Sequence, residues 1–359
     1  MSSLDAALLE REEALAPRRG ARRRAVLARW PSRSASLVLA LGALVVCAFA
    51  SVAHGSVEIG WGTVVSAFTS FDGSNEHIIV RELRVPRTLI GIGVGAALAL
   101  TGALMQAVTR NPLADPGILG IESGAALAIV LAIFLLRVSS VSGYVWFAFL
   151  GAAATAVVVY LLGSVGREGA TPVKLALAGA VMAAFLSSIS SAILVLDVNT
   201  LDQFRFWVVG SLAGRDLGVF LDVLPFMAVG LVLALASGRA LNTLSLGEEV
   251  ARSLGQRVAF VRGLAALAVV LLAGSAVAAA GPIAFVGLAV PHAARILVGP
   301  DWRWILAYSV VLGPVLLLGA DILGRIVARP AEVQVGIMTA LVGAPVFVYI
   351  ARRGKLAEL

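Results

Sequence analysis

The side chains that could catalyse a reaction or bind a metal are few and far apart in this sequence. Cys47 is the only cysteine, so one chain can form neither a disulfide nor a thiolate metal site. His54, His77 and His292 are too widely separated to indicate a metal-ligand cluster. A GxxxxGK(S/T) phosphate-binding loop is missing from the sequence, so we expect this chain alone not to hydrolyse ATP. The sequence therefore predicts no catalytic residue and no metal site.

Charged residues nevertheless recur at helical spacing in two places. Arg84 and Arg87 are three apart, which places them on one face of a helix that Pro86 would start. Asp321 and Arg325 are four apart, a spacing that suits an ion pair and lowers the cost of both charges near a bilayer. We expect both sets at the outer surface of a membrane protein.

A third polar segment, LNTLSLGEEVARSLG at 241–255, has the features of a short amphipathic helix. Ser245 is predicted to cap it, with Glu248 three residues later completing a capping box. An apolar face would comprise Leu244, Val250, Ala251 and Leu254. From the residues alone, such a helix could dock a soluble partner or lie in the headgroup plane of a membrane.

The elements that carry these residues must be mostly transmembrane helices. The chain has 359 residues, of which 60% are hydrophobic and only 14% charged, and its mean hydropathy is +0.97. A soluble domain is about 45–50% apolar and about 25% charged. The composition therefore excludes a water-soluble, disordered or collagen-like protein. The net charge is +7, but the sequence shows no basic face on a folded soluble domain, which nucleic-acid binding requires.

Hydropathy predicts about ten spans of the length needed to cross a bilayer. The expected windows are 36–54, 88–109, 117–136, 143–164, 172–196, 217–236, 260–280, 282–298, 304–323 and 335–351. The window at 282–298 is short and follows the helix-breaking Gly281-Pro282. Glycines 91, 93 and 95 lie inside the second window, where close helix packing is the expected role.

The basic residues predict that both chain ends lie in the cytosol. Most of the basic residues fall on the inner side when the N-terminus is placed inside, as the positive-inside rule requires. Residues 1–33 are expected to form an Arg-rich, disordered cytosolic tail. Residues 34–359 would form the transmembrane domain, with its inner loop at about 241–256.

Five segments in order resemble one known family. They read RVPRTL, TGALMQAVTRNPLADPGILG, LNTLSLGEEVARSLG, FVGLAVPHAARIL and TALVGAPVF, and they extend from 81 to 347. Together they are similar to the FecCD/BtuC-type permeases, the membrane subunits of type II ABC importers for ferric siderophores, cobalamin or haem. The resemblance implies an all-α, ten-helix permease fold in a bacterial cytoplasmic membrane.

The resemblance also implies partners. Two permease subunits, as a homodimer or heterodimer, would surround a central path. Two cytosolic ATPase subunits would use ATP and Mg²⁺ beneath them, and an extracytoplasmic binding protein would deliver the substrate. This chain would bind no cofactor directly and would contact lipid but no nucleic acid.

Site residues follow from the same resemblance. The ATPase-coupling segment comprises Leu244, Ser245, Gly247, Glu248, Glu249, Ala251, Leu254 and Gly255. Glu248 and Glu249 are expected to be exposed acids that meet basic residues of the ATPase. Arg84, Arg87 and Arg325 are expected to bind glutamates of the binding protein, because a guanidinium holds a carboxylate with two hydrogen bonds. Membrane-interface anchoring of Arg84 and Arg87, and pairing of Arg325 with Asp321, are the alternatives.

The resemblance also implies that the fifth span lines the translocation path. Thr171, Ser187, Ser188 and Ser191 are its candidate lining residues. Packing between helices is an equally simple role for these serines. Residues expected to support the fold are Gln106, Asn111, Pro112, Pro291 and His292. For His292 we expect a satisfied hydrogen bond, with a proton relay as the alternative.

Two other classes of protein remain possible from the residues. An ATPase-independent secondary transporter would need acids or broken-helix ion sites in the middle of its spans, and Glu122 is the nearest such acid. A membrane-embedded enzyme would need converging polar side chains at membrane depth, which this sequence does not suggest. The segment 241–255 favours the importer permease over both.

Overall fold

The structure is a computed structural model that describes residues 33–115, 117, 120–138, 141–165 and 171–352. The chain divides into two units, Met1–Gly42 and Ala43–Leu359. Of the first unit only the start of the first helix is described, so the predicted Arg-rich tail lies outside the described residues except for Arg33. The fold discussed below is that of the second unit.

Helices make up the regular structure of the described residues, which contain no strand. In chain order the elements are α2 (Arg33–Ala53), α3 (Trp61–Thr69), α4 (Asn75–Ile78), the π-helix η1 (Ile79–Arg84), α5 (Val85–Thr109), α6 (Ile121–Leu136), α7 (Val141–Gly163), α8 (Pro172–Leu196), α9 (Val198–Val208), α10 (Leu217–Ala236), α11 (Gly238–Ser245), α12 (Glu248–Ser253), α13 (Val258–Ala280), α14 (Val286–Val298), α15 (Trp302–Val327) and α16 (Val335–Arg352).

The predicted all-α membrane fold is confirmed. Seven helices in the described chain are long and apolar enough to cross a membrane, and three shorter apolar helices, at Ile121–Leu136, Val286–Val298 and Val335–Pro345, accompany them. Each of the ten corresponds to one expected window, in the same order. The short window is confirmed as α14, which is only 13 residues long.

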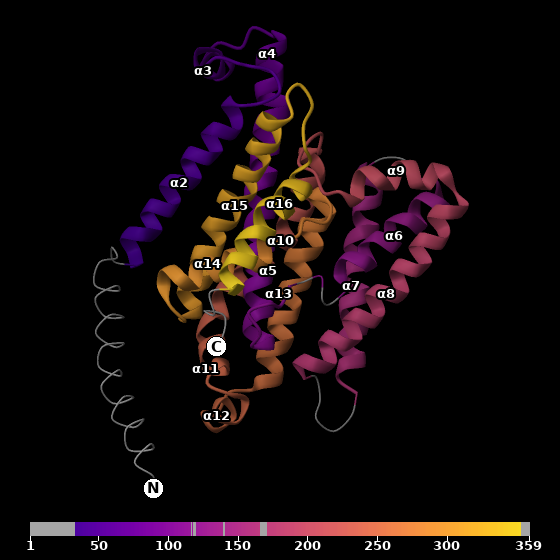
Figure 1. Ribbon diagram of the computed structural model, residues 1–359, viewed down its shortest axis with the longest axis vertical. Coiled ribbons are helices and arrows are strands. Elements are labelled where there is room, and N and C mark those ends of the chain that lie inside the picture. Colours follow the sequence, from indigo (N-terminus) through magenta and orange to yellow (C-terminus); the bar gives the residue numbers. More distant parts are fainter. Residues whose placement is uncertain (1–32, 116, 118–119, 139–140, 166–170, 353–359) are drawn as a thin grey trace, which may run out of the picture. The chain divides into compact units, whose positions relative to one another are not determined.

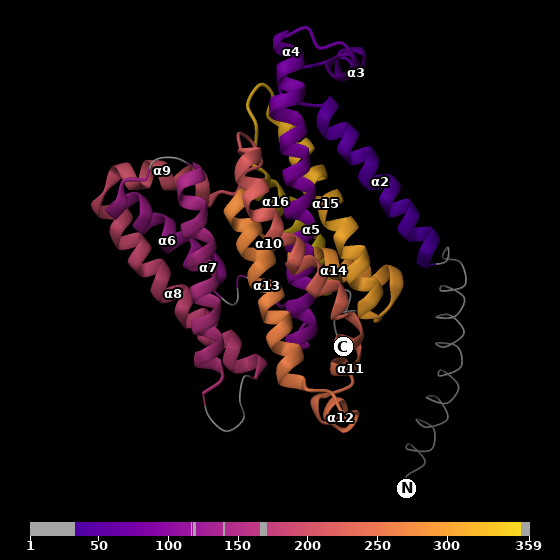
Figure 2. The same ribbon diagram turned by 180° about the vertical axis from the view of Figure 1, so that it is seen from behind.

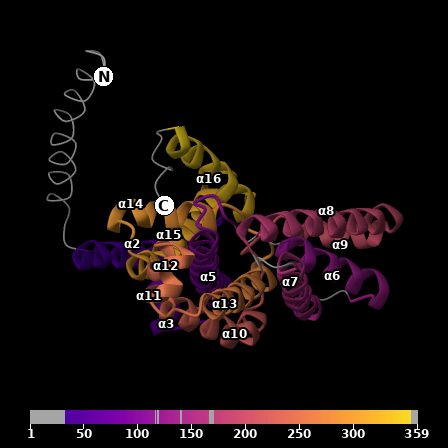
Figure 3. The same ribbon diagram turned by 90° about the horizontal axis from the view of Figure 1, so that it is seen from below.

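Helix α5 occupies the centre of the second unit, with α13, α14 and α15 packed against it (Figures 1 to 3). Glycines permit this packing. A Cβ on Gly95 would lie 2.7 Å from the backbone of Pro314 on α15, and one on Gly102 would lie 1.8 Å from the carbonyl oxygen of Gly287 on α14. The packing role predicted for small residues in the second span is therefore confirmed.

The second span is longer than its predicted window of 88–109. Helices α4, η1 and α5 run without a break from Asn75 to Thr109. Pro86 lies in the first turn of α5, as predicted, but α5 continues directly from the π-helix η1 instead of beginning after a loop. A proline ring normally clashes with the carbonyl four residues earlier, and the wider π-helical turn at Ile79–Arg84 directly precedes it.

The two ends of the second unit carry different short elements. Figure 1 shows α3 and α4 at its upper end and α11 and α12 at its lower end. At the upper end, the buried His77 bridges Asp72, 2.8 Å from Nδ1, and the Ser66 hydroxyl, 2.9 Å from Nε2. The positive-inside rule assigns α12 to the cytosol, so the end with α3 and α4 is the outer end.

Helix α8 differs from α5 in its surroundings. It belongs to a group with α6, α7 and α9 to one side of α5 (Figure 3). Only 11% of its most apolar 18-residue window is buried within the chain, against 83% for the helix that contains α5. Most of α8 is therefore available to lipid, to a second subunit or to a translocation path.

Candidate functional site

Helix α12 begins in a way that the sequence did not predict. Ser245 is the last residue of α11, and its hydroxyl donates to the carbonyl of Asn242 at 2.7 Å. Gly247 precedes α12 instead, with φ of 112°, a conformation that favours glycine. The predicted Ser245 cap was therefore wrong, because α11 continues through Ser245 and the chain needs a sharp turn before it can form a new helix.

The side of α12 that faces the protein packs against α11 and α13 through a small apolar core. Leu244 of α11, Ala251 of α12 and Val258 of α13 are at most 4% exposed and pack together. The side chain of Gln256 adds a hydrogen bond to the carbonyl of Ala240 at 2.9 Å. Residues from three helices therefore hold α12 in place, and Leu244 and Ala251 serve this core rather than an exposed face.

The solvent-facing side of α12 and the residue before it form an exposed apolar stripe. Leu246 is 63% exposed, Val250 45% and Leu254 65%. Val250 and Leu254 are four residues apart and lie on one side of α12, whereas Leu246 precedes the turn at Gly247. Exposed leucines at the cytosolic end of a membrane protein suit a surface that another protein covers or one that lies against lipid headgroups. Leu246 was not among the predicted residues, and the helical spacing does not extend to it because the chain turns at Gly247.

The two acids of α12 have different surroundings. Glu248 accepts hydrogen bonds from Arg252 at 2.6 Å and from Arg262, on α13, at 3.0 Å. It is only partly exposed, whereas Glu249 is exposed. Glu248 therefore connects α12 to α13, and Glu249 has the exposure that was expected of both acids. Gly255, which has φ of 81°, ends the segment.

At the outer end, the predicted arginines form one cluster around Asp321. Arg325 lies 2.8 Å from Asp321, which confirms the predicted ion pair. Arg87 also binds both carboxylate oxygens of Asp321, with donor distances of 2.7–3.2 Å. Asp321 is fully buried and Arg325 is 1% exposed. Sharing one carboxylate between two guanidinium groups limits the cost of burying these charges.

Arg84 and Arg325 also donate to backbone carbonyls in the last turn of α2 and in the loop that follows it. Arg84 donates to Val52 at 2.9 Å and to Ala53 at 2.6 Å, and also to Val57. Arg325 donates to the carbonyl oxygens of Ser51 and His54. Arg84 is only 5% exposed. The cluster therefore fixes the outer ends of α2, α5 and α15, and docking of a partner by these arginines stays a prediction.

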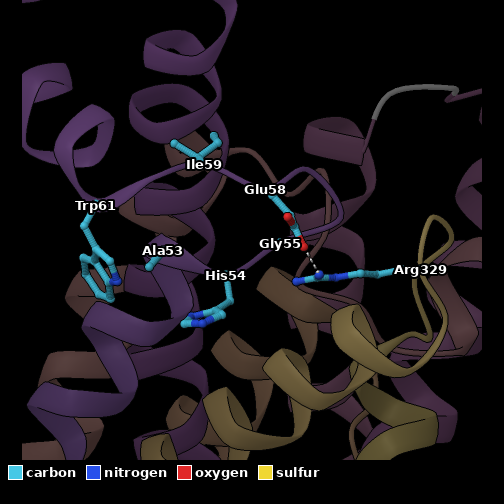
Figure 4. A pocket seen from close by; sticks show the side chains of 7 residues that line it. All are labelled: Ala53, His54, Gly55, Glu58, Ile59, Trp61 and Arg329. Atoms are coloured by element: carbon cyan, nitrogen blue, oxygen red, sulfur yellow. Dashed lines mark hydrogen bonds and ion pairs between the residues drawn. The ribbon is translucent and has the colours of Figure 1, made fainter.

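Two glutamates complete the outer cluster at its surface. Glu332, in the loop between α15 and α16, accepts from Arg87 at 2.7 Å. In the same loop, Arg329 donates to Glu58 at 2.8 Å across an open pocket (Figure 4). The rings of His54 and Trp61 lie edge to face on another side of this pocket, 6.5 Å between centroids. Glu332, Arg329 and Glu58 were not predicted, since no spacing in the sequence links them.

The predicted path residues lie on α8. Thr171 caps the helix by accepting from the backbone N–H of Lys174 at 3.4 Å. Ser187, Ser188 and Ser191 are all exposed. Ser187 lies 3.5 Å from Ser123 of α6, and the Ser188 hydroxyl donates to the carbonyl of Ala184. Their exposure suits a path, and that role stays a prediction.

Three of the predicted structural residues shape the inner end of α5. The side-chain nitrogen of Gln106 is 3.3 Å from the carbonyl oxygens of Gly287 and Leu288, which ties α5 to α14. Asn111 follows the end of α5 and accepts from the backbone N–H of Leu113 at 2.9 Å, across Pro112. The chain thus turns sharply from α5 towards α6.

The other two structural residues lie within α14. Pro291 and His292 are both buried, at the helix interior. The Nε2 atom of His292 has no hydrogen-bond partner among the described residues. The satisfied hydrogen bond predicted for His292 is therefore not found at that nitrogen, which is buried.

Comparison with known proteins identifies the same family that the sequence motifs resemble, over most of the chain. The FecCD transport family model matches residues 43–353. The probable siderophore transport system permease YfiZ of Bacillus subtilis is 51% identical over 89% of this chain and 96% of its own length. The ferric enterobactin permease FepD of Escherichia coli is 44% identical over 86% of this chain and 92% of its own length.

A solved structure extends the comparison to the fold. An inward-facing metal-chelate type ABC transporter is similar with a TM-score of 0.78 and 30% sequence identity. The match covers 89% of this chain and 99% of the other. Sequence and fold are therefore similar over nearly the same extent.

Proposed function

Because the chain belongs to the FecCD transport family, we propose that it is the permease subunit of an ATP-binding-cassette importer for ferric siderophores. Family membership and seven long apolar helices in the described chain make it a multi-pass permease of the cytoplasmic membrane. The substrate, the energy source and the assembly are the proposed parts.

Relatives of known description support an iron chelate as the substrate. Besides YfiZ and FepD, they include the Fe(3+)-citrate permease YfmD of Bacillus subtilis, at 46% identity. The hemin permease HmuU of Yersinia pestis is more distant, at 36%. Haem is therefore one alternative substrate, and cobalamin is the other that the resemblance implies. The identity to siderophore permeases, over about nine-tenths of the chain, is the observation that carries the proposal.

The lower end of the molecule supports an external source of energy. The sequence contains no phosphate-binding loop. Leu246, just before α12, and Val250 and Leu254, on α12 and at its end, are exposed where a cytosolic protein can reach them. We assign this stripe, together with Glu249, to contact with an ATPase subunit that uses ATP and Mg²⁺. Movement of α12 would reach the membrane helices through the buried core with Val258 and through the Glu248–Arg262 ion pair.

The exposed α8 supports the proposed dimer. A helix in which only 11% of the apolar window is buried leaves a large face for a second permease subunit and for the path between them. Thr171, Ser187, Ser188 and Ser191 would then offer weakly polar contacts. Weak contacts suit transport, since a permease must release what it takes up.

Growth under iron limitation tests the proposed substrate. A deletion strain should lose growth on one or more ferric siderophores as sole iron source and regain it with the wild-type gene. Growth on haem and cobalamin-dependent growth should be unaffected. Loss of haem use or of cobalamin use, with siderophore use intact, would instead favour the alternative substrates.

A further inference from the structure

We infer that α3 is an interfacial helix, which inserts Trp61, Val65 and Phe68 among the phospholipids of the outer leaflet. This inference depends on the chain being a membrane protein, which family membership and the apolar helices establish. It does not depend on the proposed substrate, ATPase or binding protein. The apolar face of α3, its depth, its continuity with α2 and a neighbouring cation all favour lipid as the occupant.

Helix α3 exposes large apolar side chains on one side. Trp61 is 55% exposed, Val65 59% and Phe68 53%. Their spacings of four and three residues place them on one face of the helix. Val64 and Ala67 lie on another side and are buried, and none of the nine residues of α3 is charged. Exposed apolar side chains that gather on one face indicate a surface that lipid or another molecule covers.

The depth of α3 is that of the lipid headgroups. Ala53 ends α2, and its carbonyl oxygen accepts from Arg84 at 2.6 Å, at the outer end of the membrane-spanning part. Helix α3 packs against Val80, four residues before Arg84 on the continuous helix that runs to Thr109. Four residues rise about 6 Å along a helix. The headgroup region adds about 5–7 Å to each side of the hydrocarbon core, so α3 lies within it.

The exposed face of α3 continues the apolar surface of α2. Val45 is 52% exposed, Val46 67% and Phe49 62%. His54 directly follows α2, and its ring lies edge to face with that of Trp61, 6.5 Å between centroids (Figure 4). Figure 1 shows α3 next to the outer end of α2. The lipid that surrounds the transmembrane helix therefore reaches α3 without an intervening polar surface.

Arg81 supplies a positive charge beside the same face. Its guanidinium lies 5.8 Å from the ring centre of Phe68 and 4.5 Å from that of Phe71, which is 48% exposed. A guanidinium can hold a phosphate group with two hydrogen bonds. Aromatic side chains are enriched at membrane interfaces, where the phosphates of the lipid headgroups also lie. Arg81 and the aromatic rings therefore match both parts of a phospholipid, the phosphate and the upper acyl chains.

Fluorescence quenching of the full chain in lipid nanodiscs tests the inference. Cys47 is the only cysteine, so Val65→Cys in a Cys47→Ser background carries a single bimane label. Two quenchers are compared, namely phospholipid with a nitroxide on the fifth acyl carbon and iodide in the buffer. The matched control is Glu76→Cys, an exposed position on α4 that lies eight residues, or about 12 Å, beyond Arg84.

The ratio of lipid quenching to iodide quenching should be at least about two-fold higher at position 65 than at position 76, because the apolar face of an interfacial helix lies about 5–10 Å deep. Trp61→Cys, one turn earlier on the same face, should give the same ratio as Val65→Cys. Equal ratios at positions 65 and 76, or a lower ratio at position 65, would overturn the inference.

Addition of the cognate binding protein distinguishes lipid from a protein that covers the same face. Both quenchers should act on position 65 to the same extent with and without it, because lipid already occupies the face. A label that the added protein shields from both quenchers would show that protein docking is the role of α3, and would overturn the inference.

Discussion

The outer and inner ends of this permease are stabilised by different kinds of interaction. The outer end buries charge, with Asp321 and Arg325 essentially inaccessible and linked to Arg87. The inner end buries the apolar side chains of Leu244 and Ala251 and leaves its ion pairs close to solvent. Buried charges tolerate little rearrangement, whereas a small apolar core can move as a unit. The outer end is therefore built to stay fixed and α12 to transmit movement.

The largest expected effect is at the outer end. Asp321→Asn leaves Arg87 and Arg325 buried with one negative charge fewer, which should lower the free energy of unfolding by about 3–5 kcal/mol. Thermal unfolding of the purified protein, in detergent and in nanodiscs, measures this loss. Glu332→Gln is the control and should cost less than about 1 kcal/mol. Equal losses in the two variants would contradict a buried outer network.

The next effect is at the inner surface. Leu246→Asp with Leu254→Asp places charges on the exposed stripe, where they should not alter the thermal unfolding temperature. Binding of the ATPase subunit should weaken by at least about ten-fold, equivalent to about 1.4 kcal/mol. Co-purification and titration of the ATPase subunit measure it. Arg257→Asp, at an exposed position after α12, is the control for charge alone.

A smaller effect should follow from Arg262→Gln. This change removes the ion pair between α12 and α13, and its stability cost should be about 1 kcal/mol or less, because Glu248 keeps Arg252. ATPase binding should persist while transport per ATP hydrolysed falls. Uptake and phosphate release measured on the same vesicles give that ratio. An unchanged ratio would show that the ion pair does not couple the two helices.

The smallest effect concerns a partly exposed carboxylate at the outer end. A hydrogen bond from the Thr200 hydroxyl, helped by the backbone N–H of Asn199 and by Arg137, lowers the pKa of Asp197, which caps α9. A lowered pKa adds stability above the unfolded-state pKa of about 4 and loses it as pH falls through the folded value. The protection factors of the α9 amides, which correct for the intrinsic pH dependence of exchange, should therefore fall below pH 4. Asp197→Asn should remove this pH dependence, and a wild-type response near pH 7 would contradict it.

Hydropathy and local spacing predicted much of this architecture. Ten apolar segments, the Asp321–Arg325 pair and a short helix at 248–253 all depend on residues close in sequence, so periodicity reveals them. The short helices α3 and α4 at the outer end were not predicted, because they are too short to be transmembrane spans. The apolar spacing of α3, with Trp61, Val65 and Phe68 exposed, was a usable signal.

Long-range partners could not be predicted in the same way. Arg87 binds Asp321 and Glu332, which are more than 200 positions away. Sequence spacing placed Arg84 beside Arg87 on one outer face, but it cannot say whether a guanidinium points to solvent or to backbone carbonyls. For the same reason Glu248 was taken for an exposed acid, although Arg262 lies beside it in the fold.

Transport by reconstituted vesicles tests the central claim most directly, namely that this chain moves its substrate only when an ATPase acts on α12. Vesicles that contain the permease, the ATPase subunits and ATP, supplied with the binding protein and a radiolabelled ferric siderophore, should accumulate iron against a gradient. Vesicles with the permease alone should not. Accumulation by the permease alone, driven by an ion gradient, would contradict the account.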